Sequence, residues 1–337
     1  MRLYEGPAGA RVLAFGGYQP SRVVTNDELA ATVDTNDEWI RSRVGIASRR
    51  LAGPDETVAD MAVAAGGKAL AGSGLSPADI DLVIVATCTA EVMIPNTAAV
   101  VARRLGISAP GAFDLNAACA GFCYALAAAS DAVRAGSARY VLVIGAEKLS
   151  QWVDWTDRST CIIFADGAGA AVVGPVYAPA GGPDGAVEPG GSDPEPGIGI
   201  GPVVWGSDGD MADKICIKDR YSLIFQEGQS VFRWATTALH PVAIQACEAA
   251  GVDPTELAVF VPHQANLRII ESLARRLGAP QAIVANDIVT AGNTSSASIP
   301  LALSRMIERG EVSSGDKALL IGFGAGVCYA AQVIAIP

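Results

Sequence analysis

The stretch Phe113–Leu126, FDLNAACAGFCYAL, passes from a short apolar segment through a turn of small residues into an Ala- and Leu-rich segment. We predict a strand at Gly111–Leu115 and a helix at Ala120–Arg134, which places Cys119 on the turn between them. Unpaired N–H groups and the positive end of the helix dipole meet at such a turn, and this setting lowers the pKa of a thiol. Most cysteines are nevertheless inert and buried. Cys119 is therefore a candidate nucleophile that needs support from the rest of the chain.

Composition narrows the class of protein. The chain has 337 residues, of which 50% are hydrophobic and 18% are charged, so it can bury a large core. Its formal net charge of −11 argues against a nucleic-acid partner. The seven cysteines are scattered and form no CxxC pair, which fits neither a disulfide framework nor a zinc site and suits a reducing cytosol. We expect no bound metal.

The sequence shows no targeting or membrane-spanning pattern. Met1–Ala10 lacks the charged and apolar regions of a signal peptide. No apolar run reaches the length that a bilayer requires. We therefore expect a cytoplasmic protein without a membrane partner.

The order of the predicted elements repeats. Cys119–Gly145 contains a small-residue turn, an Ala- and Leu-rich helix, a Gly break and the strand VLVIG, and Ser296–Gly322 has the same order and ends in ALLIG. Alternating strands and helices predict an α/β fold, and the repeat predicts two halves related by a pseudo-twofold axis. We place the halves at residues 1–175 and 203–337. The Gly- and Pro-rich residues 176–202 are interpreted as a linker or loop.

Two polar residues lie at element ends in the second half. His263 directly follows the predicted strand Leu257–Pro262, and Asn293 lies in the loop before the predicted helix Ser296–Arg309. Sheets of α/β proteins bind ligands at the carboxyl ends of their strands, so a duplicated sheet can bring Cys119, His263 and Asn293 to one cavity. Each residue alone is more often structural. Together, at three element ends, they are interpreted as a catalytic set.

Six motifs make the sequence similar to a known family. They are VVTNDELA…DTNDEWIRSRVGIASRR (residues 23–50), AACAGF (117–122), DRST…FADGAGAAVV (157–173), VPHQANLRII (261–270), GNTSSASIPLAL (292–303) and FGAGVCYA (323–330). The set extends over essentially the whole chain. It resembles the β-ketoacyl-acyl-carrier-protein synthase III enzymes, of actinobacterial type, in the thiolase-like condensing-enzyme superfamily. The resemblance implies a thiolase-like duplicated α/β/α/β/α layered fold, with two pseudo-twofold-related halves and mixed five-stranded sheets.

The resemblance also implies a reaction. Cys119 takes an acyl group from an acyl-CoA, malonyl-acyl-carrier protein loses CO2, and its carbanion attacks the acyl-cysteine to give a 3-oxoacyl-acyl-carrier protein, CO2 and CoA, which initiates fatty-acid synthesis. His263 and Asn293 donate hydrogen bonds to the thioester oxygen of the developing enolate. The backbone N–H groups of Cys119 and Ala325 bind the oxyanion at the acyl-cysteine. No cofactor is implied besides the two substrates.

Further residues match substrate-binding positions of the family. Those implied for CoA and its pantetheine arm are Thr35, Trp39, Arg43, Arg158, Asn266 and Arg268, with Trp39 and Arg158 enclosing the adenine. Those implied for docking the acidic acyl-carrier protein are Arg233, Arg268, Arg275 and Arg276.

The acyl pocket is matched by Ile94 and Phe323. In the family the position of Ile94 reaches across a homodimer interface, so the resemblance implies a homodimer. The intermediate size of Ile94 implies acetyl to short branched starters. The segment between Asp210 and Glu227 looks shorter than in close relatives, and this loop helps to wall the entrance.

Other functions remain open at this point. A priming ketosynthase of a polyketide pathway would use the same residues. A non-condensing acyltransferase on the same fold tends to alter the His and Asn pair, which is intact here. A non-catalytic partner subunit loses its cysteine, and a papain-like hydrolase is typically secreted and disulfide-bearing.

Overall fold

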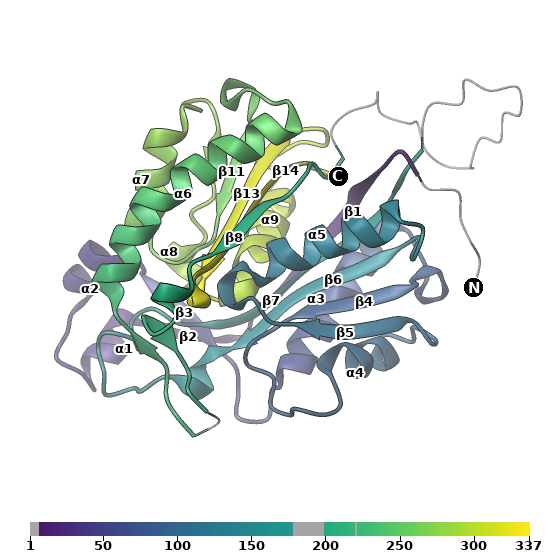
Figure 1. The fold of residues 1–337 in the computed structure, drawn as a ribbon. Coiled ribbons are helices and arrows are strands. Elements are labelled where there is room, and N and C mark those ends of the chain that lie inside the picture. The colour runs from purple at the N-terminus through teal and green to yellow at the C-terminus, as the bar shows by residue number, and fades with distance from the viewer. Residues whose placement is uncertain (1–6, 178–198, 220) are drawn as a thin grey trace, which may run out of the picture.

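Two five-stranded mixed sheets form the framework of the structure (Figure 1), a computed structural model that describes residues 7–177, 199–219 and 221–337. The first sheet has the order β1-β7-β6-β4-β5 and the second has the order β8-β14-β13-β11-β12. The strands of the first sheet are β1 (Gly9–Tyr18), β4 (Leu82–Ala86), β5 (Gly111–Leu115), β6 (Val141–Lys148) and β7 (Asp166–Val176). Those of the second are β8 (Val204–Ser207), β11 (Val259–Pro262), β12 (Ile283–Val284), β13 (Lys317–Gly324) and β14 (Cys328–Ala335).

The two sheets share one topology. In the first, β4 runs parallel to β5 and β6, and β7 runs antiparallel to β6 and β1. In the second, β11 runs parallel to β12 and β13, and β14 runs antiparallel to β13 and β8. Strand order and direction therefore repeat as the duplication predicts. Of the predicted linker, residues 178–198 lie outside the described residues.

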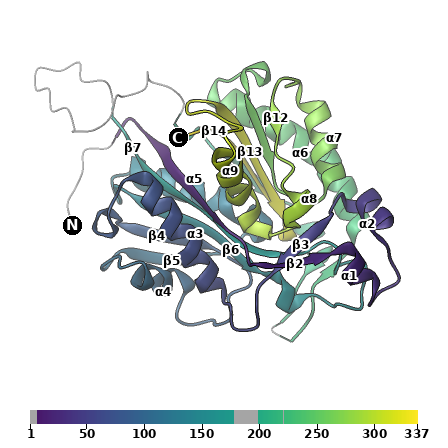
Figure 2. The ribbon, with the colours of Figure 1, turned by 180° about the vertical axis from the view of Figure 1, so that it is seen from behind.

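Helices form three layers around the two sheets (Figures 1 and 2). The outer face of the first sheet is covered by α3 (Val58–Ser73) and α4 (Thr97–Arg104), and that of the second by α6 (Gly228–Ala250) and α7 (Leu267–Leu277). Between the sheets lie α5 (Gly121–Arg134) and α9 (Ser298–Glu308). The predicted α/β/α/β/α layering is confirmed. No helix within the described ranges is long and apolar enough to cross a bilayer.

The smaller elements gather beside one end of the sheets. They are α1 (Asn26–Ala30), α2 (Asp37–Val44), α8 (Ile288–Ala291), the antiparallel pair of β2 (Arg22–Thr25) and β3 (Ser48–Leu51), and the antiparallel pair of β9 (Ile215–Cys216) and β10 (Phe225–Gln226). Most of them pack into a separate apolar cluster. The side chain of Asn36 caps α2, and Gly45 ends it in the left-handed conformation.

The central helices are apolar because each lies between two sheets. Phe122 and Leu126 of α5, together with Ile299 and Leu303 of α9, are buried in one continuous cluster with strands of both sheets. A helix that faces a sheet on each side has no solvated face to carry polar residues. This burial holds the beginnings of α5 and α9 in fixed positions relative to each other.

Two glycines let the halves approach closely at the beginnings of these helices. A Cβ atom on Gly145 of β6 would lie 2.5 Å from the Ser296 carbonyl oxygen, and one on Gly324 of β13 would lie 2.6 Å from the Cys119 amide nitrogen. Neither contact tolerates a side chain without backbone movement. Each sheet therefore packs against the turn that belongs to the other half.

Candidate active site

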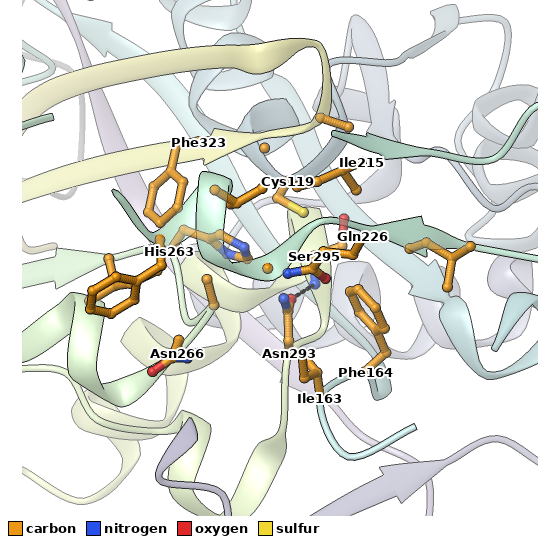
Figure 3. Close-up of a pocket in the computed structure, with 18 of the residues that line it drawn as sticks. Cys119, Ile163, Phe164, Ile215, Gln226, His263, Asn266, Asn293, Ser295 and Phe323 are labelled. Carbon is orange, nitrogen blue, oxygen red and sulfur yellow. Dashed lines mark hydrogen bonds between the residues drawn. The ribbon is translucent and has the colours of Figure 1, made fainter. Parts of the chain in front are cut away.

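A cavity of about 960 Å³ lies where the two halves meet, and residues from both halves line it. Cys119 comes from the first half, and His263 and Asn293 come from the second (Figure 3). Figure 3 shows the Cys119 sulfur, the His263 ring and the Asn293 carboxamide directed into the same space. The structure thus brings together the three residues that the sequence singles out.

Cys119 lies in a single 3-10 turn, η2 (Ala118–Ala120), immediately before α5. The predicted lowering of its thiol pKa is wrong for this structure. Burial of the thiol raises its pKa to about 12, and the negative charge of Glu147 acts in the same direction. The Ser295 hydroxyl lowers the pKa but does not compensate. The physical reason is that burial removes the thiolate from water, and the hydrogen bonds to it do not offset this cost.

The turn before α9, η6 (Ser295–Ala297), repeats the backbone of the Cys119 turn. Ala118 has a φ of 45° and Ser295 a φ of 51°, both in the left-handed region. This conformation costs a non-glycine residue roughly 1–2 kcal/mol. The strain therefore occurs at equivalent points of the two halves, directly before Cys119 in one and two residues after Asn293 in the other.

His263 is held as a neutral hydrogen-bond donor. It follows β11, and its backbone N–H donates to the Ile321 carbonyl oxygen at 2.8 Å. Its Nδ1 lies 2.7 Å from the Ser298 hydroxyl, which accepts the Gln264 backbone N–H at 3.3 Å. The hydroxyl keeps its own proton, which it can give to Nδ1, and in that arrangement the ring proton lies on Nε2. Burial lowers the pKa of His263 to about 3, so the ring carries no charge.

The side chain of Asn293 is oriented by its neighbour. The Ser295 backbone N–H donates to Asn293 Oδ1 at 2.8 Å, the contact drawn in Figure 3. The backbone of Asn293 is fixed by the segment before β7, because its N–H donates to the Ile163 carbonyl at 3.0 Å and its carbonyl accepts the Ala165 N–H at 2.9 Å. With Oδ1 occupied, the Nδ2 amide group is the end that remains to donate into the cavity.

Sequence reasoning missed a buried carboxylate behind Cys119. Glu147 Oε2 accepts the Thr89 hydroxyl at 2.6 Å and the Cys88 backbone N–H at 3.1 Å. Its Oε1 lies 3.1 Å from the Ser295 hydroxyl and 2.9 Å from that of Ser296. A signal was present, because Glu147 belongs to a strand in which every residue is buried. Charged residues are almost never placed so without a partner or a purpose.

Aromatic and cationic groups gather around Trp39, which lines the cavity, whereas Arg158 and Thr35 are not among its lining residues in the described chain. The Arg158 guanidinium lies 4.9 Å, and that of Arg43 5.6 Å, from the Trp39 ring centre, at cation–π distance. Arg158 also donates to the Asp34 carbonyl at 2.8 Å. The Thr35 hydroxyl is buried without a hydrogen-bond partner in the structure described. Trp39 and Arg43 line the cavity.

The predicted docking arginines divide into two groups. Arg233 and Arg268 line the cavity and are exposed, and Arg268 lies over the Phe232 ring at 5.1 Å. Arg275 and Arg276 lie in the last turn of α7. Arg275 lies 4.0 Å from Glu271, and Arg276 donates to the Thr236 carbonyl.

Asn266 lines the cavity, but both ends of its carboxamide are engaged. Its oxygen caps α7 by accepting the Arg268 N–H at 2.9 Å, and its nitrogen donates to the Arg43 carbonyl at 3.2 Å. Asn266 thereby ties α7 to the end of α2. Its second amide hydrogen and the second lone pair of its oxygen remain for a pantetheine arm.

The two predicted acyl-pocket residues lie in different places. Phe323 is buried at the cavity, with its ring edge-on to His263 at 5.2 Å between centres. Ile94 is 89% exposed on the segment between β4 and α4 and does not line the cavity within the described chain. The segment 210–227 contains β9 and β10, and Ile215, Ile217 and Ile224 from this region form part of the cavity wall.

The sequence is similar to curated proteins over nearly its whole length. Residues 113–183 match the family described as 3-oxoacyl-[acyl-carrier-protein (ACP)] synthase III, and residues 247–336 match its C-terminal counterpart. Beta-ketoacyl-[acyl-carrier-protein] synthase III 4 of Streptomyces coelicolor is 57% identical over 329 residues, covering 98% of this chain and 99% of that protein. The mycobacterial beta-ketoacyl-[acyl-carrier-protein] synthase III of Mycobacterium avium is 48% identical over 345 residues, covering 99% and 97%.

Solved structures agree with this similarity. The priming β-ketosynthase from the R1128 polyketide biosynthetic pathway superimposes with a TM-score of 0.91 at 44% identity, covering 100% of this chain and 98% of that one. The 3-oxoacyl-[acyl-carrier-protein] synthase III of Aquifex aeolicus VF5 gives 0.88 at 39% identity, covering 97% and 100%. Since relatives this similar extend over the whole chain, the protein belongs to the β-ketoacyl-[acyl-carrier-protein] synthase III family of condensing, acyl-transferring enzymes.

Proposed function

We propose that this protein condenses an acyl-CoA starter with malonyl-acyl-carrier protein through an acyl group held on Cys119. Cys119, His263 and Asn293 have the roles given above. The observation that carries the proposal is the convergence of these three side chains, from two halves of the chain, on one cavity. The starter is acetyl or a short branched acyl group.

The geometry supports a division of labour between the two half-reactions. For decarboxylation, His263 offers Nε2–H and Asn293 offers Nδ2–H, and both are fixed donors whose charge does not change. Fixed donors stabilise an enolate oxygen without reorganising during the reaction. For acylation, the close packing of Gly324 on Cys119 brings the backbone of Ala325 beside the nucleophile. The N–H groups of Cys119 and Ala325 then bind the oxyanion of the tetrahedral intermediate.

The cavity fits a long substrate that is polar at one end. Its rim carries Arg43, Arg233 and Arg268, whose positive charges suit the phosphates of CoA and of a phosphopantetheine arm. Trp39 and Arg158 now lie against each other, and we propose that they move apart to enclose the adenine between them. Thr35 and Asn266 are proposed as further CoA contacts. The proposed reaction needs no cofactor, and in the described residues no group of His, Cys, Asp or Glu is arranged to hold a metal ion. We place the protein in the cytoplasm.

The open edge of the first sheet supports a homodimer. β5 is an edge strand, and Phe113 on it is 40% exposed. Met93 and Ile94, on the segment that leads to α4, are 82% and 89% exposed. An open edge strand can pair with another chain, and an exposed apolar patch marks a site of association. We propose that a second copy covers this edge and receives Ile94 at its acyl pocket. We also propose that, along the sequence, residues 176–202 form the boundary between the two halves.

The proposed function predicts an acyl adduct that forms and then disappears. Intact-protein mass spectrometry after incubation with acetyl-CoA should show one acetyl group, which peptide mapping assigns to Cys119. Adding malonyl-acyl-carrier protein should remove it with release of CO2. A panel of acyl-CoAs of increasing length ranks the starters. An adduct that forms but is insensitive to malonyl-acyl-carrier protein would contradict condensation, and the absence of any adduct would contradict the whole proposal.

A priming ketosynthase of a polyketide pathway is the second candidate. The observation that favours it is the structural similarity to the priming β-ketosynthase of the R1128 pathway. Both functions use the same chemistry at Cys119. The two functions are separated by measuring condensation rates with one starter and with malonyl groups carried by either a fatty-acid or a polyketide acyl-carrier protein. The faster carrier protein identifies the function.

The α7 arginines provide a test of carrier-protein docking. Replacing Arg275 and Arg276 together with Glu should raise the apparent KM for malonyl-acyl-carrier protein about tenfold, because repulsion of an acidic partner slows its encounter with the cavity. Acylation by acetyl-CoA should stay unchanged. The matched control is Arg103→Glu with Arg104→Glu, which reverses two consecutive charges in the last turn of α4. Equal losses in both half-reactions, or in both double variants, would argue against docking at α7.

A further inference from the structure

Acylation requires the Cys119 thiol to lose a proton, and His263 is not built to take it. Burial raises the pKa of the thiol and lowers that of His263, so His263 is a weak proton acceptor. His263 Nδ1 is also occupied by the Ser298 hydroxyl. Nε2 in turn carries the proton that the decarboxylation step needs as a donor. The proton acceptor must therefore lie elsewhere.

Ser295 lies between Cys119 and Glu147. In the described chain, Glu147 is the only carboxylate that contacts the Ser295 hydroxyl. This hydroxyl lies 3.1 Å from Glu147 Oε1, and it lowers the pKa of the Cys119 thiol. Ser295 lines the cavity, and Figure 3 shows it below the Cys119 sulfur. Its φ of 51° is the strained conformation that η6 imposes. Backbone strain of this kind is maintained where the surrounding structure fixes a residue for a purpose.

We propose that Ser295 passes the proton of Cys119 to Glu147, so that Glu147 holds this proton for as long as Cys119 carries the acyl group. The inference rests on the proposed function and extends it to a proton acceptor. Ser295 lines the cavity below the Cys119 sulfur, whereas Glu147 acts through Ser295.

Each step balances. In acylation the Cys119 S–H proton moves to Ser295 Oγ while the Ser295 proton moves to Glu147 Oε1, and the thiolate forms a bond to the thioester carbon. The carbon–sulfur bond to CoA breaks, and the CoA thiolate leaves and takes a proton from water. In condensation, malonyl loses CO2, the carbanion attacks the acyl carbon, and the Cys119 thiolate departs. It regains its proton from Glu147 by the reverse path.

This proton relay from Cys119 through Ser295 to Glu147 moves a negative charge from one buried group to another and creates no new one. Before transfer the buried pair is a neutral thiol and a carboxylate, and after transfer it is a thiolate and a neutral acid. Glu147 opposes the Cys119 thiolate while it is charged, and that opposition ends when it takes the proton. Burial raises the pKa of Glu147, which improves it as a proton acceptor. A thiolate beside a charged Glu147 would instead place two negative charges at one dry site.

No cation neutralises Glu147 within the described structure. The titratable groups that face it are the thiols of Cys88 and Cys119, and Cys88 Sγ lies 3.5 Å from Oε1. Lys148, the next residue, directs its ammonium to the carbonyls of Gly53, Pro54 and Glu56. The remaining contacts of the carboxylate are the neutral donors described above. The acylation rate should accordingly rise with pH as Glu147 loses its proton.

The test compares Ser295→Ala with Ser296→Ala. Both delete one hydroxyl next to Glu147 Oε1, but only Ser295 also faces the thiol, and Ser296 directs its hydroxyl to the Ala86 carbonyl at 2.9 Å. Single-turnover acylation by acetyl-CoA, followed by mass spectrometry from pH 5 to 9, should be about 100-fold slower in Ser295→Ala, within the usual range for losing acid–base assistance. Its rise with pH through the Glu147 ionisation should vanish. Ser296→Ala should keep the wild-type profile.

Two further measurements separate the relay from a structural role. Ser295→Ala retains the backbone N–H that orients Asn293, so CO2 release from malonyl-acyl-carrier protein should stay within about threefold of wild type. Glu147→Gln should show the same acylation defect if it folds. A wild-type acylation rate and pH profile in Ser295→Ala would overturn the relay. Failure of the wild-type protein to acylate Cys119 would instead overturn the proposed function.

Discussion

We expect Cys119→Ala to lower the rate of 3-oxoacyl-acyl-carrier protein formation by about 10⁴-fold or more, the largest effect of any single replacement. The variant has no atom that can hold the acyl group, so neither half-reaction has its covalent intermediate. Mass spectrometry after incubation with acetyl-CoA should show no adduct, while a steady-state assay with malonyl-acyl-carrier protein measures the loss. The small side chain leaves the close contact between Gly324 and the Cys119 backbone intact.

Cys123→Ala is the matched control. Cys123 lies one helical turn further along α5, is fully buried, and packs against Gly322 in the central cluster. Its pKa is raised to about 12 by burial, as that of Cys119 is, but it does not line the cavity in the described chain. Acylation should persist in this variant. Condensation by Cys119→Ala, or loss of the adduct in Cys123→Ala, would contradict the assignment of the nucleophile.

We expect the second-largest effect from His263→Ala and Asn293→Ala. Each removes one of the two donors that we propose for the enolate oxygen, and a single donor of this kind is worth about 10²–10³-fold in rate. CO2 release from malonyl-acyl-carrier protein should fall by that factor in either variant. Acylation of Cys119 by acetyl-CoA should stay within about tenfold of wild type, because the donors proposed for that step are the backbone N–H groups of Cys119 and Ala325.

The other histidine, His240, provides the control for this difference between the decarboxylation and acylation rates. His240 Nε2 lies 2.8 Å from the Arg276 carbonyl, between α6 and α7, and His240 is not among the residues that line the cavity in the described chain. His240→Ala should change neither half-reaction. A loss of acylation as large as the loss of decarboxylation in His263→Ala would contradict the division of labour and assign the thiol proton to His263.

The internal repeat explains why so much of the fold could be predicted. The strand patterns LVIVA, VLVIG and ALLIG are apolar throughout because β4, β6 and β13 are buried on both faces. β8, β14 and the two-stranded pairs were not predicted. β8 is short and partly exposed. β14 follows β13 so closely that the apolar pattern does not show where one strand ends and the next begins. Only the antiparallel pairing with β13 defines β14.

The sequence predicted which residues line the site, but not their protonation states or the buried groups that contact them. Element ends pointed to Cys119, His263 and Asn293, whereas the tautomer of His263 depends on Ser298, 35 positions away in the chain. Glu147 meets Ser295 across 148 positions. Such pairs arise from folding, and no spacing in the sequence encodes them. The pKa of Cys119 was mispredicted for the same reason, since local turn geometry does not reveal how much water the folded halves exclude.

By itself the sequence determined the layered α/β class, the duplication, and which cysteine, histidine and asparagine deserve attention, because strand periodicity, small-residue turns and element ends are local properties. Only the tertiary structure decided that Cys119 rests against Gly324 of the opposite half, that His263 is neutral, and that a buried carboxylate stands behind Ser295. These properties depend on burial and on contacts between distant segments. Burial sets the cost of every charge in the cavity, and it exists only once the two halves have come together.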